Sequence, residues 1–427
     1  MTTTTLDSAP RPSAKTAKVF FPSLNGLRFI AAFVVIIHHL EQIKLFFGLP
    51  SLFFEWHCIK IIGELGVTLF FTLSGFLITY LLLAEKERFG TVAVKEFYIR
   101  RVLRIWPLYY LIIALGLFVL PNIHFFDIPI YTEGVHYKFG IKLFFYGLLF
   151  PNVIANLYPY MPFIAQTWSI GIEEQFYLVW PWMVKWSKRY LAVLIGIIIG
   201  LLLITNILYQ FADLSPDISQ ASGKTKLITF LYRFFAMLRI SCMAIGGIGA
   251  YFLYHFNMKI LRPIFKKWVQ LATVLGVVAM VILGVEIPFV NHEFYSLFFI
   301  VIILNLAANP DSLFNMENKT MDYLGKISYS IYMWHGIAII FGLHAARYVN
   351  PELNTWWGNT IYYTVTFVLT LAFSAASYEW FEMQFLKFKH LFAKIQSGNL
   401  KERTPVLLEH TKNRLPKSEI TEGSPKF

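Results

Sequence analysis

The sequence carries ionisable side chains inside a stretch that is otherwise apolar. Residues 24–47 read LNGLRFIAAFVVIIHHLEQIKLFF, and His39 follows Arg28 at an offset of eleven residues. Eleven helical residues make three turns and about 20° more, so Arg28 and His39 share a helix face and lie about 16 Å apart along the axis. His38 points about 100° away from His39. Burying such groups costs several kcal/mol unless they line a polar cavity, so this face is expected to border one.

An imidazole held inside an apolar helix has useful acid–base chemistry. It can take a proton from a hydroxyl as a general base, or carry an acyl group for a short time. His39 is therefore a candidate catalytic residue. The alternative is a structural histidine that is hydrogen-bonded to its surroundings, together with an arginine that snorkels to the membrane surface.

Three arginines form a second candidate group. Arg100, Arg101 and Arg104 lie within about one helical turn in FYIRRVLRIWPLYYLI, residues 97–112. Positions separated by three or four residues share a helix face, so three guanidiniums there can clamp the phosphates of an anionic substrate. The alternative is anchoring of the helix end at a cytoplasmic membrane surface.

Two adjacent carboxylates form the third group. Glu173 and Glu174 lie near the start of an apolar stretch in QTWSIGIEEQFYLVWPW, residues 166–182. Carboxylates at such a position are costly unless they are paired or functional, although they also suit the N-terminus of a helix. A catalytic carboxylate here can orient His39 or bind the hydroxyls of an acceptor.

The composition indicates the elements that must position these residues. Hydrophobic residues make up 57% of the 427 residues, charged residues make up 15%, and long apolar runs recur along nearly the whole chain. This pattern is typical of a polytopic helical membrane protein.

The net charge of +12 comes mostly from loops beside these runs, so it indicates orientation in a membrane rather than nucleic-acid binding. Two cysteines, Cys58 and Cys242, exclude a disulfide framework, and no metal-ligand spacing is present.

Eleven apolar stretches are candidate membrane spans. They are 24–47, 60–83, 104–120, 141–156, 170–186, 190–211, 228–255, 268–285, 290–308, 327–347 and 359–383. Basic loops favour the cytoplasmic side. Placing residues 85–104, 185–189 and 257–267 there, together with both termini, requires that one stretch does not cross. The weakest stretch is 141–156, which contains a proline and two asparagines.

The predicted architecture is therefore an all-α transmembrane bundle of about ten spans with both termini cytoplasmic. Residues 121–168 are predicted to form an external segment with a re-entrant or interfacial helix. The predicted divisions are a cytoplasmic N-terminal tail over 1–20, a transmembrane domain over 21–388 and a flexible cytoplasmic tail over 389–427.

Motifs along residues 22–388 resemble those of membrane acyltransferase family 3, the integral-membrane O-acyltransferases of bacteria and animals. In chain order they are GLRFIAAFVVIIHH (26–39), GVTLFFTLSGFLITYLLL (66–83), the arginine and double-glutamate segments quoted above, MLRISCMAIGGIGAYF (237–252), LGKISYSIYMWHGI (324–337) and SYEWFEMQFLKF (377–388). The resemblance implies that His39 is catalytic, supported by Glu173, Glu174 or Glu382. The resemblance also implies that a second set of residues binds substrate: Arg28, Arg100, Arg101, Arg104, Arg239, Tyr332 and His335.

The chain departs from the family pattern at several positions. The family often has an acidic residue where this chain has Thr68, and Glu64 lies one turn earlier. It often has another where this chain has Cys242, so the partner of Arg239 is left open. In the closing motif, Met383 and the following glutamine replace an arginine and a proline, while Glu382 is retained.

The resemblance implies transfer of an acetyl or short acyl group from acetyl-CoA or another acyl-CoA to a carbohydrate of the cell envelope. The expected partners are the acyl-CoA, an envelope carbohydrate or lipid-linked glycan, membrane lipid and a separate extracytoplasmic transferase. The protein is not expected to bind nucleic acid, a metal ion or a permanently bound cofactor. The expected location is the inner (cytoplasmic) membrane, with multiple passes. The alternative function is a proton-coupled transporter or an exporter of a glycolipid, because intramembrane His, Arg and Glu also suit transport.

Overall fold

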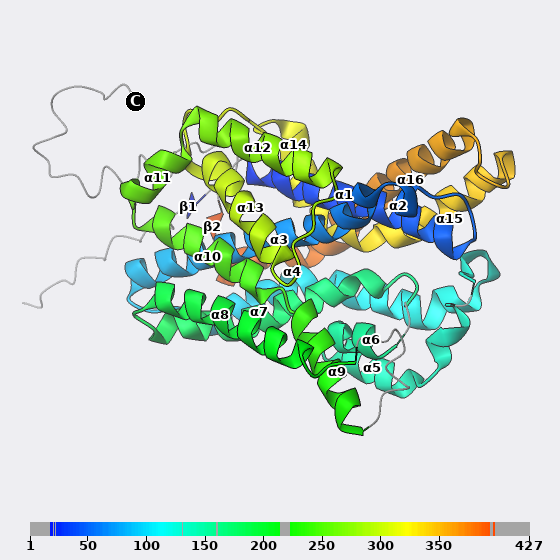
Figure 1. The fold of residues 1–427 in the computed structure, drawn as a ribbon, viewed down its shortest axis with the longest axis horizontal. Helices are drawn as coiled ribbons and strands as arrows, with labels where there is room; N and C mark the ends of the chain where they lie inside the picture. The colour runs from blue at the N-terminus through cyan, green and yellow to red at the C-terminus, as the bar shows by residue number, and fades with distance from the viewer. Residues whose placement is uncertain are drawn as a thin grey trace, which may run out of the picture.

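The computed structural model describes residues 18–19, 21, 23–129, 131–158, 161–213, 223–392 and 396–397, and this part of the chain is almost entirely helical (Figure 1). The long helices are α1 (Leu24–Phe46), α3 (His57–Phe89), α4 (Val94–Ala114), α7 (Trp168–Trp186), α8 (Tyr190–Tyr209), α9 (Gly223–Met237), α10 (Ile240–Tyr254), α12 (Lys267–Ile282), α13 (Asn291–Ala308), α15 (Ser328–Val349) and α16 (Trp356–Ala376). Apart from 141–156, every predicted apolar stretch coincides with these helices.

Shorter elements join the long helices. They are α2 (Leu52–Glu55), α5 (Phe139–Gly147), α6 (Pro151–Leu157), α11 (Met258–Ile264), α14 (Lys319–Lys326), α17 (Met383–Leu386), the π-helical segments η1 (Leu115–Val119) and η7 (Ser377–Glu382), and the 3-10 turns η2 (Leu120–Asn122), η3 (His124–Phe126), η4 (Glu133–His136), η5 (Ala165–Thr167) and η8 (Lys389–Phe392). Two two-residue strands, β1 (Lys18–Val19) and β2 (Gln396–Ser397), pair in parallel.

Seven helical stretches of the described chain are long and apolar enough to cross a membrane, or eight if α11 and α12, bent by 64°, form one span. The prediction of ten spans exceeds eight by two helices, α7 and α15. Both have sufficient length, but α7 carries Glu173, Glu174 and Lys185, and α15 carries histidines and hydroxyl side chains. The two helices that are too polar for this criterion are therefore helices with candidate site residues.

The stretch 141–156 is divided between α5 and α6, which have nine and seven residues. Leu149 lies between them with a positive φ of 63°, so the helix cannot continue through it. At 1.5 Å per residue, neither helix reaches the roughly 30 Å needed to cross the hydrocarbon core. This agrees with the expectation that this stretch does not cross as a single span.

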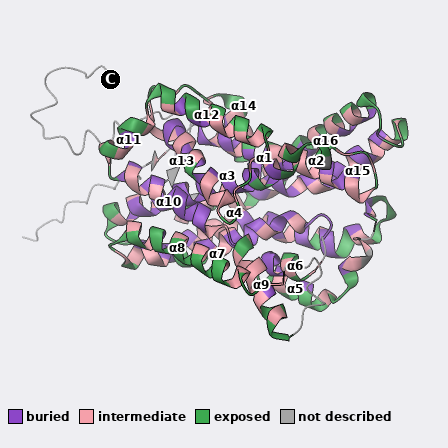
Figure 2. Cartoon of the chain, in the orientation of Figure 1, coloured by how far each residue is buried: buried purple, intermediate pink, exposed green. Residues whose placement is uncertain are grey.

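The centre of the bundle is α3, which packs against α1 on one side and α10 on another. Glycines allow the backbones of α3 and α10 to touch. A Cβ added at Gly75 would lie 2.0 Å from the carbonyl oxygen of Met243, and one added at Gly246 would lie 2.0 Å from that of Thr72. Close approach through small residues is a common way to associate helices in membranes. Figure 2 shows buried residues along these central helices, whereas α8 and α12 at the periphery consist mostly of intermediate and exposed residues.

Ordered structure continues beyond residue 388, where the flexible tail was predicted to start. The turn η8 packs against α4, and β2 pairs with β1 in the register Lys18↔Gln396. The two strands and α11 lie at one end of the molecule, on the left in Figure 1. Residues 1–17, 20, 393–395 and 398–427 of the two predicted tails lie outside the described residues.

Candidate functional site

Two histidines from distant motifs meet inside the bundle. His39 of α1 and His335 of α15 are joined by a contact of 2.9 Å between His39 Nδ1 and His335 Nε2. Their rings are stacked with centroids 4.9 Å apart. The contact spans nearly 300 residues of sequence, and it exists because α15 packs directly against α1.

The hydrogen bonds of His335 assign the proton positions of the pair. His335 Nδ1 lies 2.7 Å from the carbonyl oxygen of Tyr332, which can only accept, so this nitrogen carries a proton. In the neutral ring, His335 Nε2 then accepts a hydrogen bond from His39 Nδ1. The Nε2 atom of His39 is left with its lone pair free. This is the protonation state that a general base requires.

His38, the neighbour of His39, faces a different helix. Its Nδ1 lies 3.1 Å from the carbonyl oxygen of Ile59, and its ring packs on Gly63 of α3. A Cβ at Gly63 would lie 2.3 Å from His38 Cγ, so any larger residue there would displace the ring. The structure therefore gives His38 a packing role against α3, and it gives His39 the contact with the second histidine.

A cavity opens beside this pair and is lined by cations from two helices. Its walls include Arg28 of α1, Arg101 and Arg104 of α4, and Glu173 of α7. The cavity meets the predicted face of α1 at Arg28 but does not extend along it to His39. His39 and His335 are not among its lining residues, but Tyr332 is, and the backbone of Tyr332 holds His335.

The arginines of the cavity are poorly compensated. Within the described part of the chain, neither Arg28 nor Arg104 forms a hydrogen bond or an ion pair. Arg101 stacks over Phe97 and Tyr177 at 5.8 and 5.7 Å, and its buried Nε has no hydrogen-bond partner. Guanidiniums held away from bulk water without partners are costly, and an anionic ligand removes that cost.

Arg100, the third arginine of the predicted clamp, does not line the cavity. It donates from Nη1 to the carbonyl oxygen of Phe392 at 2.6 Å, and its Nη2 lies 3.5 Å from Glu85 Oε2. Arg100 therefore holds η8 against α4. Arg100 does not join Arg101 and Arg104 in the cavity lining, although all three were predicted to act together.

Lys389 is a charged residue near this site that the sequence analysis did not select, because it falls in the predicted tail. Its pKa lies well below the ordinary lysine value, because the side chain is buried and because Arg104, Arg101, Arg100 and Arg28 lie close by. The only sequence signal for it is its position directly after the closing motif. Lys389 extends the group of cations from α1 and α4 to η8.

The three predicted carboxylates have different surroundings. Glu173 lines the cavity and accepts a hydrogen bond of 2.9 Å from the hydroxyl of Tyr177. Glu174 faces α4, where it accepts from the indole of Trp106 at 3.1 Å. Glu382 accepts from two serine hydroxyls and is absent from the cavity lining. Glu173 and Glu174 diverge because consecutive helical residues point about 100° apart.

Arg239 lies away from the cavity lining and has a clear partner. Its Nη2 lies 2.9 Å from Glu64 Oε2, and its Nη1 donates to the carbonyl oxygen of Glu64 at 3.3 Å. Glu64, one turn before Thr68, is therefore the ion-pair partner of Arg239, which the sequence left open. The remaining predicted substrate-binding residue, Tyr332, places its hydroxyl 2.8 Å from Ser169 Oγ.

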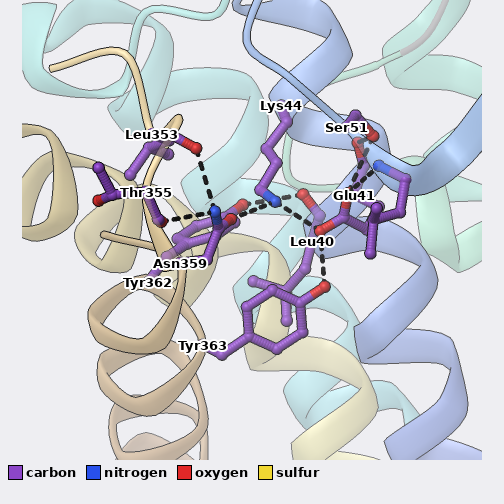
Figure 3. Close-up of polar contacts among 10 residues, drawn as sticks. Leu40, Glu41, Lys44, Ser51, Leu353, Thr355, Asn359, Tyr362 and Tyr363 are labelled. Atoms are coloured by element: carbon purple, nitrogen blue, oxygen red, sulfur yellow. Dashed lines mark hydrogen bonds and ion pairs between the residues drawn. The ribbon is translucent and has the colours of Figure 1, made fainter. Parts of the chain in front are cut away.

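Beyond His39, α1 ends in a different kind of charged cluster (Figure 3). Glu41 and Lys44 are almost completely buried and form an ion pair of 2.6 Å. Lys44 also donates to Asn359, and Glu41 accepts from the hydroxyl of Tyr363 and the backbone N–H of Leu52, each at 2.6 Å. The charges are compensated by protein groups, so this network ties α1 to α16 and to the start of α2.

The chain is similar to a known protein family and to curated proteins. The sequence matches the family described as "Acyltransferase domain" over residues 21–379. It is 26% identical to the peptidoglycan O-acetyltransferase OatA of Listeria monocytogenes over 383 residues, which are 83% of this chain and 54% of the relative. It is 27% identical to the O-acetyltransferase OatA of Staphylococcus aureus strain NCTC 8325 over 381 residues, 85% of this chain and 57% of the relative.

The chain therefore spans little more than half the length of these curated relatives. No solved structure matches it. The family match covers nearly all of the described helices, including α1, α15 and the residues of the cavity. With several apolar helices long enough to cross a bilayer, the protein is a multi-pass membrane protein, and it belongs to membrane acyltransferase family 3.

Proposed function

We propose that the chain is an O-acyltransferase that moves an acetyl or short acyl group from an acyl-CoA to a hydroxyl of an envelope carbohydrate. The main support for the proposal is that two features of the structure lie next to each other. One is a histidine pair that leaves a lone pair on His39 Nε2. The other is the cavity beside it, in which Arg28, Arg101 and Arg104 face one carboxylate, Glu173.

The cations supply the donor site in this proposal. Coenzyme A carries phosphates, and arginines bind phosphate oxygens through pairs of N–H donors. Arg28, Arg101 and Arg104 face the cavity, and Lys389 lies close to them. The phosphates bind there, and the thioester reaches toward Tyr332 and the histidine pair.

His39 performs the proton transfers. Its Nε2 takes the proton of the acceptor hydroxyl while the hydroxyl oxygen attacks the thioester carbonyl carbon. The C–S bond then breaks, and the CoA thiolate takes the proton from the His39 imidazolium. The products are an ester and free CoA, so atoms and charge balance. His335 accepts from His39 Nδ1 throughout and thereby keeps Nε2 available for the reaction.

The donor site is proposed to face the cytoplasm of a cell with an inner membrane. Lys86 donates to carbonyl oxygens of Val184, Lys185 and Ser187 at 2.8 to 3.0 Å, which brings two basic loops to one end of the bundle. The β1–β2 pair and the basic α11 lie at that end too (Figure 1). Positive loops favour the cytoplasmic side, which supports cytoplasmic termini and ten spans, counting α7 and α15.

The acceptor is proposed to be a glycan that approaches from the opposite side of the membrane. The name of the Listeria relative, a peptidoglycan O-acetyltransferase, supports an envelope glycan as the class of acceptor. The alternative, a proton-coupled transporter or glycolipid exporter, uses the same intramembrane charges without breaking a thioester.

The test is release of CoA from radiolabelled acetyl-CoA by the purified protein, together with transfer of the label to envelope material. We expect His39→Ala to lower both by about 100-fold or more, the contribution of a positioned general base. His344→Ala is the matched control, because His344 is also on α15 but bonds only to the exposed carbonyl of Phe125 among the described residues. Normal turnover by His39→Ala would refute the assignment of the base. An absence of CoA release by the wild type would favour the transporter.

A further inference from the structure

A second polar cluster lies outside the cationic cavity and has no place in the donor site. It joins Glu64 of α3, Arg239 at the break between α9 and α10, and His292 at the start of α13. Glu64 Oε2 lies 2.9 Å from Arg239 Nη2 and 3.5 Å from His292 Nε2. The other nitrogen of His292, Nδ1, lies 3.0 Å from the hydroxyl of Thr68.

The cluster is open on one side. The Glu64 side chain is 50% exposed, whereas Arg239 and His292 are 11% and 19% exposed. The Arg239 guanidinium lies over the ring of Trp168 at 5.2 Å, and its buried Nε has no hydrogen-bond partner. This contrasts with Glu41 and Lys44, which are covered and compensated. An accessible carboxylate backed by an oriented guanidinium and an imidazole is suited to bind a polar ligand.

The backbone is irregular at the same point. α9 ends at Met237 and α10 begins at Ile240, so Arg239 lies in the break within a stretch long enough to cross a membrane. In membrane proteins, such breaks occur where the backbone is covered by protein or borders a polar space. Discontinuous helices at membrane depth are a common way to build binding sites.

The cluster shares a wall with the donor cavity. Phe71 lines the cavity and packs edge-on against Trp168, with ring centroids 6.3 Å apart. Ser169, the next residue, lines the cavity and contacts Tyr332. On the other flank, Gly63, the residue before Glu64, packs against the ring of His38. The cluster is therefore linked to the histidine pair through Ser169 and Tyr332 on one flank and through His38 on the other.

Building on the proposed function, we propose that Glu64, Arg239 and His292 form the acceptor subsite, and that its ligand is a carbohydrate bound through neighbouring hydroxyls. The Glu64 carboxylate accepts from one hydroxyl, while the Arg239 guanidinium donates to an adjacent oxygen. His292 holds the carboxylate from behind and Trp168 holds the guanidinium in plane. The donor then approaches His39 from the cavity, and the acceptor approaches it from the other side of the wall that contains Trp168 and Ser169.

The experiment separates acceptor binding from donor binding. Glu64→Gln and Arg239→Lys are expressed in cells, and ester-linked acetyl is released from the envelope by mild base and measured. The same variants are purified, and their affinity for CoA and thermal unfolding are measured. We expect acetylation to fall about 10- to 100-fold, the effect of losing a hydrogen bond to a charged group, while the Kd for CoA stays within about twofold.

The matched control is Glu286→Gln. Glu286 lies 3.4 Å from His57, and both side chains of that pair are about half exposed, but the pair has no contact with the wall of the cavity among the described residues. It is expected to leave acetylation and CoA affinity unchanged.

Two results would overturn the subsite. One is normal acetylation by both variants, and the other is an equal loss of acetylation, CoA binding and thermal stability, which would make the pair structural. Failure of the proposed function looks different, because the wild type itself would then neither bind CoA nor acetylate the envelope.

Discussion

The two ends of α1 both carry charged side chains inside the bundle, but the surroundings of these charges are opposite. At one end, Arg28 faces a cavity together with Arg104, and neither has a partner in the described chain. At the other end, Glu41 and Lys44 satisfy each other and are closed in by Asn359 and Tyr363 (Figure 3). His39 lies between these ends.

This difference indicates that the Arg28 end of α1 is a binding site and that the Glu41 end is a structural clamp. A compensated buried ion pair costs little to keep but a great deal to break. A cation beside a cavity without an ion-pair partner raises the free energy of the folded protein, and a bound anion lowers it again. Removing charge should therefore impair ligand binding at the Arg28 end and impair folding at the Glu41 end.

The largest effect is expected from the double variant Arg28→Ala/Arg104→Ala. Losing two charge-assisted contacts of about 1.5–3 kcal/mol each should raise the Kd for CoA by at least about 100-fold. Thermal stability should be unchanged or higher, because two neighbouring like charges are removed. Calorimetric titration with CoA and a thermal melt measure the two quantities. Arg347→Ala, at the other end of α15, is the control, and a lower melting temperature with unaltered CoA affinity would contradict the comparison.

The next effect is expected from Lys44→Met, and it should appear in stability. The substitution leaves Glu41 buried without its cation, which costs about 3–5 kcal/mol. The Kd for CoA of the folded fraction should stay at the wild-type value. Thermal or denaturant unfolding in detergent measures the loss.

The double variant Glu41→Gln/Lys44→Met sharpens this prediction. Removing both charges together should recover at least half of the loss, because no unpaired charge remains. Additive losses from the two single variants would show that the pair is not coupled, and the clamp interpretation would then be wrong.

A smaller effect is expected between the two ends, at His335. His335→Ala removes the acceptor that fixes the His39 tautomer, so turnover should fall about 30-fold, a part of what a positioned base supplies. His335→Gln should recover some of the rate, because its amide oxygen can accept from His39 Nδ1. CoA affinity should not change. Equal rates for the alanine and glutamine variants would argue against the tautomer role.

The smallest effect is expected at Lys389 and depends on pH. Its pKa is lowered by burial and by the nearby arginines, and a bound phosphate would raise it again. Between the lowered and the restored pKa, CoA binding takes up a proton, so affinity should fall as pH rises. Lys389→Met should weaken CoA binding about threefold to tenfold at low pH and flatten this dependence. Titrations of both proteins across pH measure it, and an unaltered slope would exclude Lys389 from the donor site.

Much of the architecture could be predicted because the reasons are local. Apolar runs of span length indicated α1, α3 and α8. The run over 141–156, which its proline and asparagines marked as one that does not cross, is divided between the short helices α5 and α6. The helical period predicted that the shared face of Arg28 and His39 would border a cavity; Arg28 lines it and His39 does not. Lys389 was missed, because nothing local distinguishes a lysine in a polar tail from one packed against arginines.

Where one motif holds two residues of the same type, the sequence could not predict which of them lines the cavity. Glu173 and Glu174 are neighbours, yet one lines the cavity and the other faces Trp106. Arg100 and Arg101 diverge in the same way, because η8 returns from the far end of the chain to meet Arg100. The direction of a side chain is local, but what it meets depends on segments packed from elsewhere.

The sequence by itself determined a multi-pass helical membrane protein, the positions of its helices and the set of residues able to do chemistry, since apolar length and helical period act within one segment. Only the tertiary structure decided that His39 pairs with His335, and that Glu64 rather than a residue near Cys242 compensates Arg239. Such pairs join segments far apart in the chain. They form because the packing of whole helices brings the segments together, and no local pattern encodes which distant side chain will complete a buried charge.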